Sequence, residues 1–428
     1  MAPAKPALES GRRGVGSRYS SGVLSVEEAL EQILSRVQAL PTERVEVTAA
    51  LARVLAELIV STREIPPWPN SSMDGYALRA ADTRADKAVL AVVGRIVAGG
   101  MPERALRAGE AMRIFTGAPL PEGADAVIPQ EEVEDAGASN GTITVRGRVD
   151  PGAYVRRAGE DVRPGERTTS PGRVLGPAEI GLLATLGHAQ VQVHRRPRVA
   201  ILSTGNELAD LGVEPGPGQI PNTNTYTLMA QTREAGGEPI NLGVAPDRLE
   251  AIEERLQWGR DADVLVSSAG VSVGELDLVK EALTRCGAEL HLWRVSMRPG
   301  KPITFGSLDG RAVFGLPGNP VSAMVTFELF VRPALLKLGG RTALARPRVW
   351  ARAVERIANP GSRRGYLRVT LIPSGRGYGA KLTGEQGSSI LRSMVVGDGL
   401  AVVQPDQMID VGEEIEVIVF RELTSQMV

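Results

Sequence analysis

A carboxylate flanked by hydroxyls and prolines lies in the first quarter of the chain, where residues 69–79 read PNSSMDGYALR. Asp74 and Gly75 follow residues 65–69 (IPPWP), in which the prolines restrict the backbone. An Asp-Gly pair on its own is more often a turn than a binding site, because both residues favour turn conformations. The choice between the two interpretations depends on what the rest of the chain brings near Asp74.

Four loops further along the chain carry glycines, hydroxyls and acids of the kinds that bind phosphate and divalent cations. Glycine and hydroxyl loops let backbone N–H groups approach a phosphate, and a helix N-terminus adds partial positive charge. Carboxylates repel such an anion unless a divalent cation lies between them, and Mg²⁺ prefers oxygen ligands. The residues are Ser203, Thr204, Gly205 and Glu207 in STGNEL, Asp247 in APD, Ser267, Ser268, Gly270, Ser272, Gly274 and Asp277 in SSAGVSVGELD, and Pro317, Gly318, Asn319 and Pro320 in LPGNP.

The acids and the proline elbow also have a purely structural interpretation. Asp247 fits a helix N-cap, and Asp277 suits the first turn of a helix. Asn319 followed by Pro320 fits an N-cap with proline at the first helical position. Taken singly, the two acids favour capping.

A basic pair, Arg298 and Lys301 in MRPGKP, falls between the third and fourth loops. Each could lie in a solvated turn. Carboxylates, glycine loops, bases and the elbow nevertheless all fall at one edge of one expected sheet, which single structural roles do not explain. The residues therefore favour a pocket for an anionic, phosphate-bearing ligand and a divalent metal, without naming a substrate.

Four short apolar runs predict the strands that position these loops. Each run is followed by a loop with Gly or Pro and then by a helical pattern, which indicates a mostly parallel sheet covered on both faces. Ligands of such sheets bind at the carboxyl ends of the strands. Pro333 is expected to kink or end the last helix. The runs are RVAILS, PINLGV, DVLVSS and AVFGL, and the expected helices cover 222–236, 247–258, 276–286 and 320–337.

The remaining regions differ in pattern from this α/β part. Ser25 and Glu28 predict a capping box that opens a helix ended by Pro41, and a second helical pattern covers 48–58. Short β-branched runs predict a β-rich insert at about 87–145 and a second small β domain at 344–428. The sequence GPAEIGLLATLG predicts one more helix between the insert and the α/β part.

Composition limits the classes of function. A hydrophobic content of 43% and a charged content of 23% are ordinary for a soluble globular protein, and 428 residues predict about three or four domains. The formal net charge of −1 provides no global attraction for nucleic acid or anionic membranes. Cys286 is the one cysteine, the three histidines lack metal-ligand spacing, and no apolar run is long enough for a membrane span. We expect a cytoplasmic protein with no nucleic-acid or membrane partner.

Several long strings of the chain resemble the MoeA family of molybdopterin molybdenumtransferases, to which the C-terminal domain of gephyrin is related. The resemblance extends from about residue 24 to the C-terminus. The matching strings are PNSSMDGYALR, MRIFTGAPLPEGADAVIPQEE, VRRAGEDV, RPRVAILSTGNEL, SSAGVSVGELD, RPGKP and GLPGNPVSA.

The resemblance implies a multidomain α/β fold of four parts. Its centre is a molybdopterin-binding α/β domain with a mostly parallel sheet, accompanied by an elongated two-segment domain, a β-rich insert and a C-terminal β-barrel. Family members are usually homodimers that share a cleft. The expected boundaries are a disordered tail at 1–22, the two-segment domain at 23–62 and 149–195, the insert at 63–148, the α/β domain at 196–343 and the barrel at 344–428.

The implied reaction inserts molybdate into adenylylated molybdopterin, with Mg²⁺ or a similar ion, and releases AMP and molybdenum cofactor. The resemblance also allows a transient contact with a molybdopterin adenylyltransferase. With no serine–histidine or cysteine–histidine constellation in the chain, we expect electrostatic and positioning catalysis rather than a covalent protein nucleophile. By the family's motifs, the resemblance implies that the catalytic groups are Asp74, Thr116, Asp161 and Asp277, and that the metal and nucleotide ligands are Glu207, Asp247 and Asp277. It places the loop residues named above, with Arg298 and Lys301, around the anionic substrate, and Pro317 and Pro320 at the elbow. Arg368 and Ser388 are the matching residues of the C-terminal domain.

Three positions depart from the common family pattern. Ala269 stands where a second glycine is usual, which matters if that backbone needs a positive φ. Asn206 stands where Asp is frequent, and Arg298 where Lys is frequent. The arginine keeps the charge but changes the donor geometry.

Three other functions remain open. A molybdopterin adenylyltransferase shares the α/β domain but is normally a lone small domain without the SMDGYA and VRRAGED segments. A gephyrin-like scaffold needs a long linker and a fused partner domain. A generic phosphotransferase is disfavoured because no GxxxxGK[ST] motif occurs. The sequence does not separate molybdate from tungstate, since both oxyanions have nearly the same shape and charge.

Overall fold

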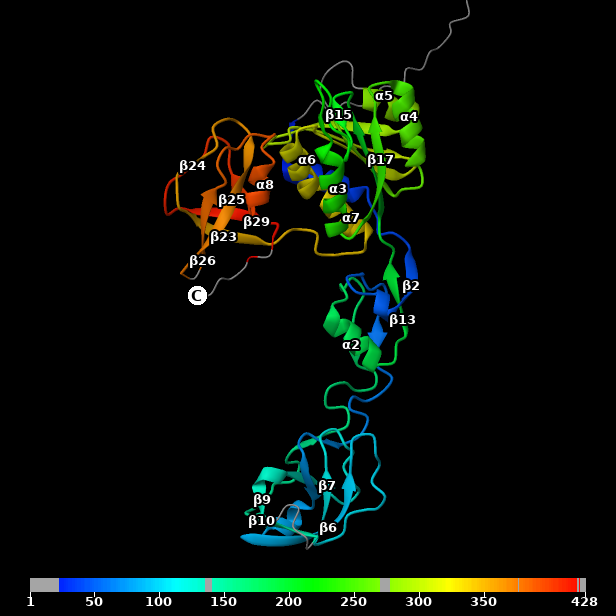
Figure 1. The fold of residues 1–428 in the computed structure, drawn as a ribbon, viewed down its shortest axis with the longest axis vertical. Coiled ribbons are helices and arrows are strands. Elements are labelled where there is room, and N and C mark those ends of the chain that lie inside the picture. The colour runs from blue at the N-terminus through cyan, green and yellow to red at the C-terminus, as the bar shows by residue number, and fades with distance from the viewer. Residues whose placement is uncertain (1–22, 135–140, 270–277, 376, 422, 424–428) are drawn as a thin grey trace, which may run out of the picture. The chain divides into compact units, whose positions relative to one another are not determined.

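The computed structural model describes residues 23–134, 141–269, 278–375, 377–421 and 423. The chain falls into two compact units, drawn with their element labels in Figure 1. We call residues 1–44, 52–56 and 192–428 unit 1, and residues 45–51 and 57–191 unit 2. Each unit is described by itself.

A seven-stranded sheet forms the centre of unit 1, in the order β1-β19-β21-β22-β18-β14-β17. The four predicted apolar runs are its four adjacent parallel strands, so the expected α/β sheet is confirmed. The sheet is extended by an antiparallel pair from residues 289–308 and by a short edge strand from residues 23–24. The sequence analysis did not predict this extension. The bounds are β1 (Val23–Leu24), β14 (Arg198–Thr204), β17 (Glu238–Ala245), β18 (Val264–Ser268), β19 (Glu289–Val295), β21 (Pro302–Leu308) and β22 (Arg311–Leu316).

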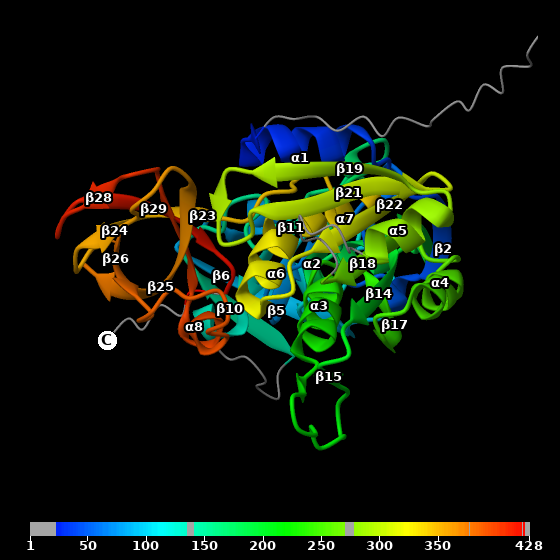
Figure 2. The same cartoon turned by 90° about the horizontal axis from the view of Figure 1, so that it is seen from above.

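Helices cover both faces of this sheet. Along β14, Val199 and Ile201 belong to one buried cluster, which includes residues of α1, α3, α6 and α7. Ala200 and Leu202 belong to a second cluster, which includes residues of α4 and α5. Figure 2 shows α3 and α6 beside the strands. The bounds are α1 (Val26–Ser35), α3 (Thr223–Glu234), α4 (Leu249–Trp258), α5 (Leu278–Arg285), α6 (Pro320–Thr326) and α7 (Arg332–Leu338).

Two local predictions about these helices are confirmed. Ser25 Oγ accepts from the Glu28 N–H at 3.1 Å, and the Glu28 carboxylate accepts from the Ser25 N–H at 2.7 Å, which completes the capping box. Pro333 interrupts the last helix: a π-helical turn, Phe327–Val331, separates α6 from α7 just before it. Proline has no N–H to donate within a helix, so the regular ladder is replaced at this point.

The helix predicted at 48–58 is wrong. A 3₁₀ turn, Val47–Ala49, is followed by turns and by β3 (Ile59–Val60). Ala52 has a φ of 62°, which an α-helix does not accommodate, and the backbone at 54–56 bonds instead to the strand at 192–194. Tertiary pairing overrides the local helical pattern here.

The C-terminal part of unit 1 is a closed five-stranded barrel, in the order β25-β26-β23-β29-β27, with β27 pairing back onto β25. Closure pairs every strand on both sides and leaves no open edge. The predicted C-terminal β-barrel is therefore confirmed. The elements are β20 (Met297–Arg298), β23 (Arg348–Ala353), β24 (Ile357–Ala358), β25 (Arg364–Ser374), β26 (Gly377–Leu382), α8 (Arg392–Val396), β27 (Gly399–Val403), β28 (Met408–Ile409) and β29 (Glu414–Val419).

Unit 2 is built around a six-stranded sheet in the order β8-β5-β7-β6-β10-β9. The helix predicted in the sequence GPAEIGLLATLG is confirmed as α2 (Pro177–Thr185). Throughout the described ranges, no helix combines the length and apolar content that a membrane crossing requires. The strands of the sheet are β5 (Gly75–Leu78), β6 (Lys87–Ile96), β7 (Glu110–Ile114), β8 (Ala126–Pro129), β9 (Val133–Glu134) and β10 (Thr142–Arg146).

Short ladders complete the chain. Among the described residues, four of them pair segments far apart in sequence, one being β24 with β28, and β15 with β16 forms a small ribbon after β14. The strands are β2 (Thr42–Glu46) with β13 (Gln190–His194), β3 with β12 (Arg167–Thr169), β4 (Asn70–Ser71) with β11 (Val155–Arg156), and β15 (Leu208–Ala209) with β16 (Ile220–Pro221).

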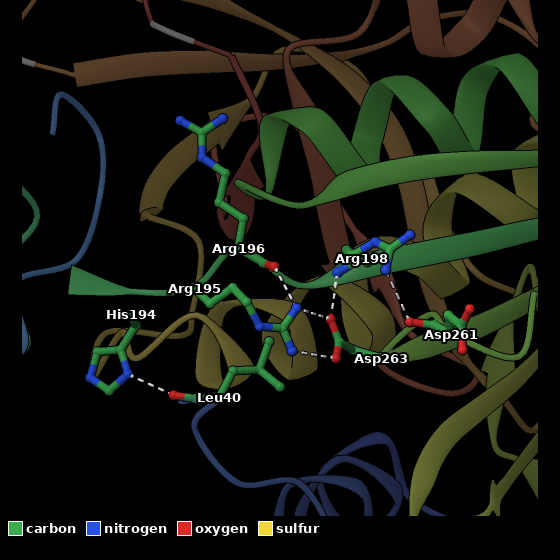
Figure 3. A network of polar contacts seen from close by, with 7 residues as sticks. All are labelled: Leu40, His194, Arg195, Arg196, Arg198, Asp261 and Asp263. Carbon is green, nitrogen blue, oxygen red and sulfur yellow. Dashed lines mark hydrogen bonds and ion pairs between the residues drawn. The ribbon is translucent and has the colours of Figure 1, made fainter. Parts of the chain in front are cut away.

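The start of β14 is held by a bidentate ion pair, shown in Figure 3. Arg195 donates to the Asp263 carboxylate at 2.7 and 2.8 Å, and the Arg198 N–H donates to the same carboxylate at 2.8 Å. Nearby, His194 Nδ1 lies 3.1 Å from the Leu40 carbonyl oxygen. These bonds fix the chain where it enters the central sheet.

Replacing Asp263 with alanine is expected to destabilise the start of β14 by about 2 kcal/mol, because three donors to a partly buried carboxylate lose their acceptor. Native-state hydrogen exchange of the β14 amides measures the change. Glu414→Ala is the control: it removes an exposed ion pair with Arg352, for which we expect about 0.5 kcal/mol or less. Equal protection in both variants contradicts the prediction.

Candidate functional site

The Asp74 side chain is exposed, and it bonds to Thr116 rather than to the backbone of its own turn. Its Oδ1 accepts two hydrogen bonds from Thr116, from the backbone N–H and from the hydroxyl, each at 2.8 Å. The turn around Asp74 is closed by Ser71, whose hydroxyl bonds to the Met73 carbonyl oxygen. Two residues predicted to be functional are thus in direct contact although 42 positions separate them.

The residue that follows this acid, Gly75, is required by the pairing of strands in unit 2. A Cβ on Gly75 would lie 1.9 Å from the Ile128 carbonyl oxygen, so only glycine fits at the start of β5, where it pairs with β8. The bonds from Thr116 lower the pKa of Asp74, and the charge of Arg113 contributes to the same effect. Asp161 lies elsewhere in unit 2, exposed, with its backbone N–H bonded to the Ile65 carbonyl oxygen.

In unit 1, the loops after β14 and β17 are bonded to each other. The Asn206 N–H donates to the Asp247 carboxylate at 3.3 Å, and the Asp247 N–H donates to Asn206 Oδ1 at 3.1 Å. The Gly205 N–H donates to the Ala245 carbonyl oxygen at 3.2 Å. The predicted N-cap role of Asp247 is wrong: Arg248 occupies the N-cap of α4, without a side-chain bond. The reciprocal bond to Asn206 takes that place.

Gly205 also explains the position of Glu207. Its φ of 146° is accessible mainly to glycine, and a Cβ there would lie 2.4 Å from a Glu207 carboxylate oxygen. The Glu207 carboxylate therefore lies folded over Gly205. This places the two acids, Glu207 and Asp247, on neighbouring loops at the carboxyl edge of the sheet.

The hydroxyls after β14 and β18 differ in their surroundings. Ser203 is fully buried and shares a 2.7 Å bond with Thr225. Ser267 Oγ is buried without a bond in the described part of the chain, whereas Ser268 Oγ accepts from Asn224 at 2.6 Å. Thr204 is buried too.

Asn224 is a site residue that the sequence analysis missed. Its amide donates to Ser268 and, at 2.7 Å, to the Gly318 carbonyl oxygen, so it joins the end of β18 to the elbow after β22. Its Oδ1 is buried and lacks a partner among the described atoms. The only signal in the sequence was the Asn-rich start of a helix, NTNTY, which also fits capping; Asn222 indeed caps α3.

Arg368 and Arg298 are two arginines that have no carboxylate partner among the described residues. Arg368 is fully buried in the barrel, where it donates to Ser393 Oγ at 2.9 Å and to the Gly387 carbonyl oxygen at 3.0 Å. Burial, together with the charge of Arg298, lowers the pKa of Arg368 to about 10, so it stays cationic at pH 7. In the described part of the chain neither guanidinium has an ion pair. The two guanidinium groups together give this region a local excess of positive charge.

The elbow contacts the barrel through Ser388, whose carbonyl oxygen accepts from the Val321 N–H at 3.0 Å. Pro317 is buried, Gly318 and Asn319 are exposed, and Pro320 is the first residue of α6. Asn319 is the N-cap residue, as predicted, but its side chain makes no capping bond. Lys301 is exposed on the segment that follows Arg298.

The donor chemistry at this edge fits Mg²⁺ in part. Glu207 and Asp247 offer carboxylate oxygens on adjacent loops, which suits a hard cation. Within the described ranges, however, no cluster of three or more acidic, histidine or cysteine side chains is close enough to hold a metal by itself. Asp277, the third predicted acid, lies outside the described residues, as do Gly270, Ser272 and Gly274.

The predicted site residues thus form two groups. Asp74, Thr116 and Asp161 belong to unit 2, and the loop residues, Arg298, Lys301, Arg368 and Ser388 to unit 1. Within unit 1 the edge of the sheet and one side of the barrel are joined. The meeting of both groups in one cleft stays a prediction.

The mostly parallel sheet and closed barrel of unit 1, with the β-rich unit 2, define a multidomain α/β protein. Family models for "MoeA N-terminal region (domain I and II)", "Probable molybdopterin binding domain" and "MoeA C-terminal region (domain IV)" match residues 24–187, 200–337 and 351–420. The chain belongs to the MoeA family.

Similar proteins agree with this assignment. A molybdopterin molybdenumtransferase from Nostoc sp. is 40% identical over 335 residues, which cover 76% of each chain. Molybdopterin molybdenumtransferase 1 of Mycobacterium tuberculosis is 37% identical over 424 residues, covering 92% of this chain and 98% of the relative. The crystal structure of a molybdopterin biosynthesis MoeA protein from Pyrococcus horikosii is 35% identical, with a TM-score of 0.78 over 94% of this chain and all of that one.

The Asp74–Thr116 contact predicts a pH-dependent stabilisation. Because the folded-state pKa of Asp74 is lowered, the contribution is complete above the aspartate pKa of the unfolded chain and is lost as the pH falls through the lower folded value. Thr116→Val removes the hydroxyl donor and keeps the backbone donor, so the pKa of Asp74 is expected to rise part of the way back. Carboxyl-carbon NMR titration measures it, Thr116→Ser is the control, and an unchanged pKa in the valine variant contradicts the assigned cause.

Ala269 has a φ of 75°, so the departure from glycine noted above carries strain. Ala269→Gly is expected to stabilise the protein by about 1 kcal/mol, because glycine adopts this conformation without a Cβ penalty. The thermal unfolding midpoint checks this. Ala251→Gly within α4 is the matched control and is expected to lower the midpoint. A fall in both variants contradicts the strain.

Proposed function

We propose that this chain is a molybdopterin molybdenumtransferase, which inserts molybdate into adenylylated molybdopterin and releases AMP and molybdenum cofactor. The relatives named above carry this activity in their names. The observation that best supports it is the pair of Arg298 and the buried Arg368, neither of which has an ion pair within the described residues. A buried guanidinium without a counter-ion is costly, and an oxyanion relieves that cost.

In the proposed reaction the residues of this chain act by binding and positioning. Arg298, Lys301 and Arg368 hold the oxyanion, and the Ser268–Asn224–Gly318 bonds fix the shape of the pocket beside it. Ser267 and Asn224 each keep a buried side-chain oxygen without a hydrogen-bond partner among the described residues, next to these bonds. Such preformed dipoles stabilise developing charge without reorganisation during the reaction.

We further propose that Glu207 and Asp247, with Asp277, hold Mg²⁺. The ion would neutralise phosphate charge next to these carboxylates. Asn206 then serves to orient Asp247 through its reciprocal bond. We also propose a cytoplasmic homodimer in which Asp74, Thr116 and Asp161 complete the cleft, and a transient contact with a molybdopterin adenylyltransferase that supplies the substrate.

The assignment is tested with purified chain, adenylylated molybdopterin and Mg²⁺, with molybdate or tungstate added, by following AMP release. Oxyanion-dependent release is expected, and its absence would remove the assignment. Asp74→Asn is expected to slow the release by about a hundredfold or more, while the thermal unfolding midpoint stays nearly unchanged, since the exposed asparagine keeps an Oδ1 acceptor for both Thr116 bonds.

Asp150→Asn is the matched control in unit 2, because Asp150 is exposed and pairs only with Arg148 among the described residues. It is expected to leave both AMP release and the midpoint unchanged. A large loss of stability in Asp74→Asn would instead favour a structural role for that turn. Formation of adenylylated molybdopterin from molybdopterin and ATP would favour the adenylyltransferase alternative.

A further inference from the structure

One face of the six-stranded sheet in unit 2 carries a row of cationic and aromatic side chains. Tyr76 on β5 is the register partner of Arg113 on β7, and Arg113 is the partner of Arg95 on β6. Register partners on neighbouring strands lie side by side on the same face. Phe115 follows two positions after Arg113, so it projects from that face as well.

The four side chains are stacked. The Arg113 guanidinium carbon lies 5.0 Å from the centroid of the Tyr76 ring and 5.0 Å from that of Phe115. The Arg95 guanidinium carbon lies 4.9 Å from the Phe115 centroid. Phe115 is therefore in contact with two cations, within the range of cation–π attraction.

Arg113 is fixed in this position, whereas Arg95 is not neutralised. Arg113 donates to the Gly75 carbonyl oxygen at 3.2 Å and to the Gln130 side chain. Arg95 is exposed, and in the described part of the chain its guanidinium has no hydrogen bond or carboxylate partner. Like charges directly opposite one another destabilise a sheet, and the Phe115 ring offsets part of that repulsion. The exposed Arg95 guanidinium is still able to bind an anion.

The row borders a pocket of about 390 Å³, lined by Tyr76, Val92, Arg95, Arg113, Phe115, Gly141 and Thr142. That volume lies at the low end of the range of small-molecule sites, roughly 300–1,000 Å³. The pocket is next to the Asp74–Thr116 pair: Phe115 precedes Thr116, and the charge of Arg113 acts on Asp74. The surroundings combine flat π-surfaces and positive charge with a predicted catalytic acid.

We propose that this pocket binds a planar nitrogen heterocycle that carries a phosphate or another anionic group, with the ring stacked on Phe115 and the guanidinium planes and the anion bound by Arg95. Aromatic rings and arginine planes bind such rings by stacking, and arginine also pairs with phosphate. The inference rests on the proposed function, whose adenylylated substrate contains an adenine and a pterin ring. It assigns one of those two rings to unit 2.

The test uses the full-length chain and two ligands, AMP for the purine and 6-carboxypterin for the pterin. Calorimetry and saturation-transfer NMR on the ring protons measure binding; saturable binding of AMP assigns the adenine ring, and that of 6-carboxypterin the pterin ring. Arg95→Gln and Phe115→Leu are each expected to weaken that binding about tenfold. Arg146→Gln, an exposed arginine on β10 of the same sheet that pairs with Glu134, is the control and is expected to bind as the parent does.

A second measurement separates this inference from the proposed function. In the AMP-release assay, Arg95→Gln is expected to raise KM about tenfold with kcat nearly unchanged, because an interaction made equally in the ground and transition states is lost. If the parent releases AMP and Arg95→Gln has the KM of Arg146→Gln, the inference is wrong while the proposed function stands. If neither ligand binds the parent, or if both variants bind as tightly as Arg146→Gln, the ring site does not exist, whatever the outcome of the release assay.

Discussion

Burial of the central sheet on both faces is the constraint from which the organisation of unit 1 follows. Val199 and Ile201 pack against one layer of helices, and Ala200 and Leu202 against the other, so β14 has no solvated face for polar groups. Polar chemistry is therefore confined to the strand ends, where Thr204 and the loop beyond it emerge. Parallel order then places all four loops at one edge.

Because polar groups are confined to that edge, a few hydrogen bonds there hold the loops in place. The loops after β14 and β17 exchange two hydrogen bonds through Asn206 and Asp247, and Asn224 joins the loop after β18 to the elbow. Beside this rim, Arg368 is buried in the barrel and has no carboxylate partner among the residues that the structure describes. The rim and the arginine together favour an anion as the missing partner.

The fold of unit 1 was largely predictable because its signals are local. The apolar runs and the caps specify strands and helices over short windows, and the box at Ser25 and the interruption at Pro333 followed from single residues. The antiparallel extension at 289–308 was missed, since its runs pair only through tertiary contacts. The helix expected at 48–58 failed for the same reason: pairing with residues 192–194 outweighs a local pattern.

The candidate site was less predictable, because hydrogen-bond partners are not encoded by residue type. Asp247 looked like a cap and instead bonds to Asn206, and Asn224, which the sequence analysis did not single out, bonds to both the end of β18 and the elbow. Asp74 and Thr116 were connected by the family resemblance, not by spacing. Cross-strand register, which sequence alone does not give, is what brings Tyr76, Arg113 and Arg95 into one row.

Gly75 has a wider consequence for unit 2. The backbone of residue 75 lies so close to the Ile128 carbonyl oxygen that any side chain would separate β5 from β8. Asp74 precedes it in the turn and Tyr76 follows it on β5, so a single residue separates the acid from the first ring of the row. The pairing of β5 with β8 therefore brings the carboxylate and the arginine row together when the sheet forms.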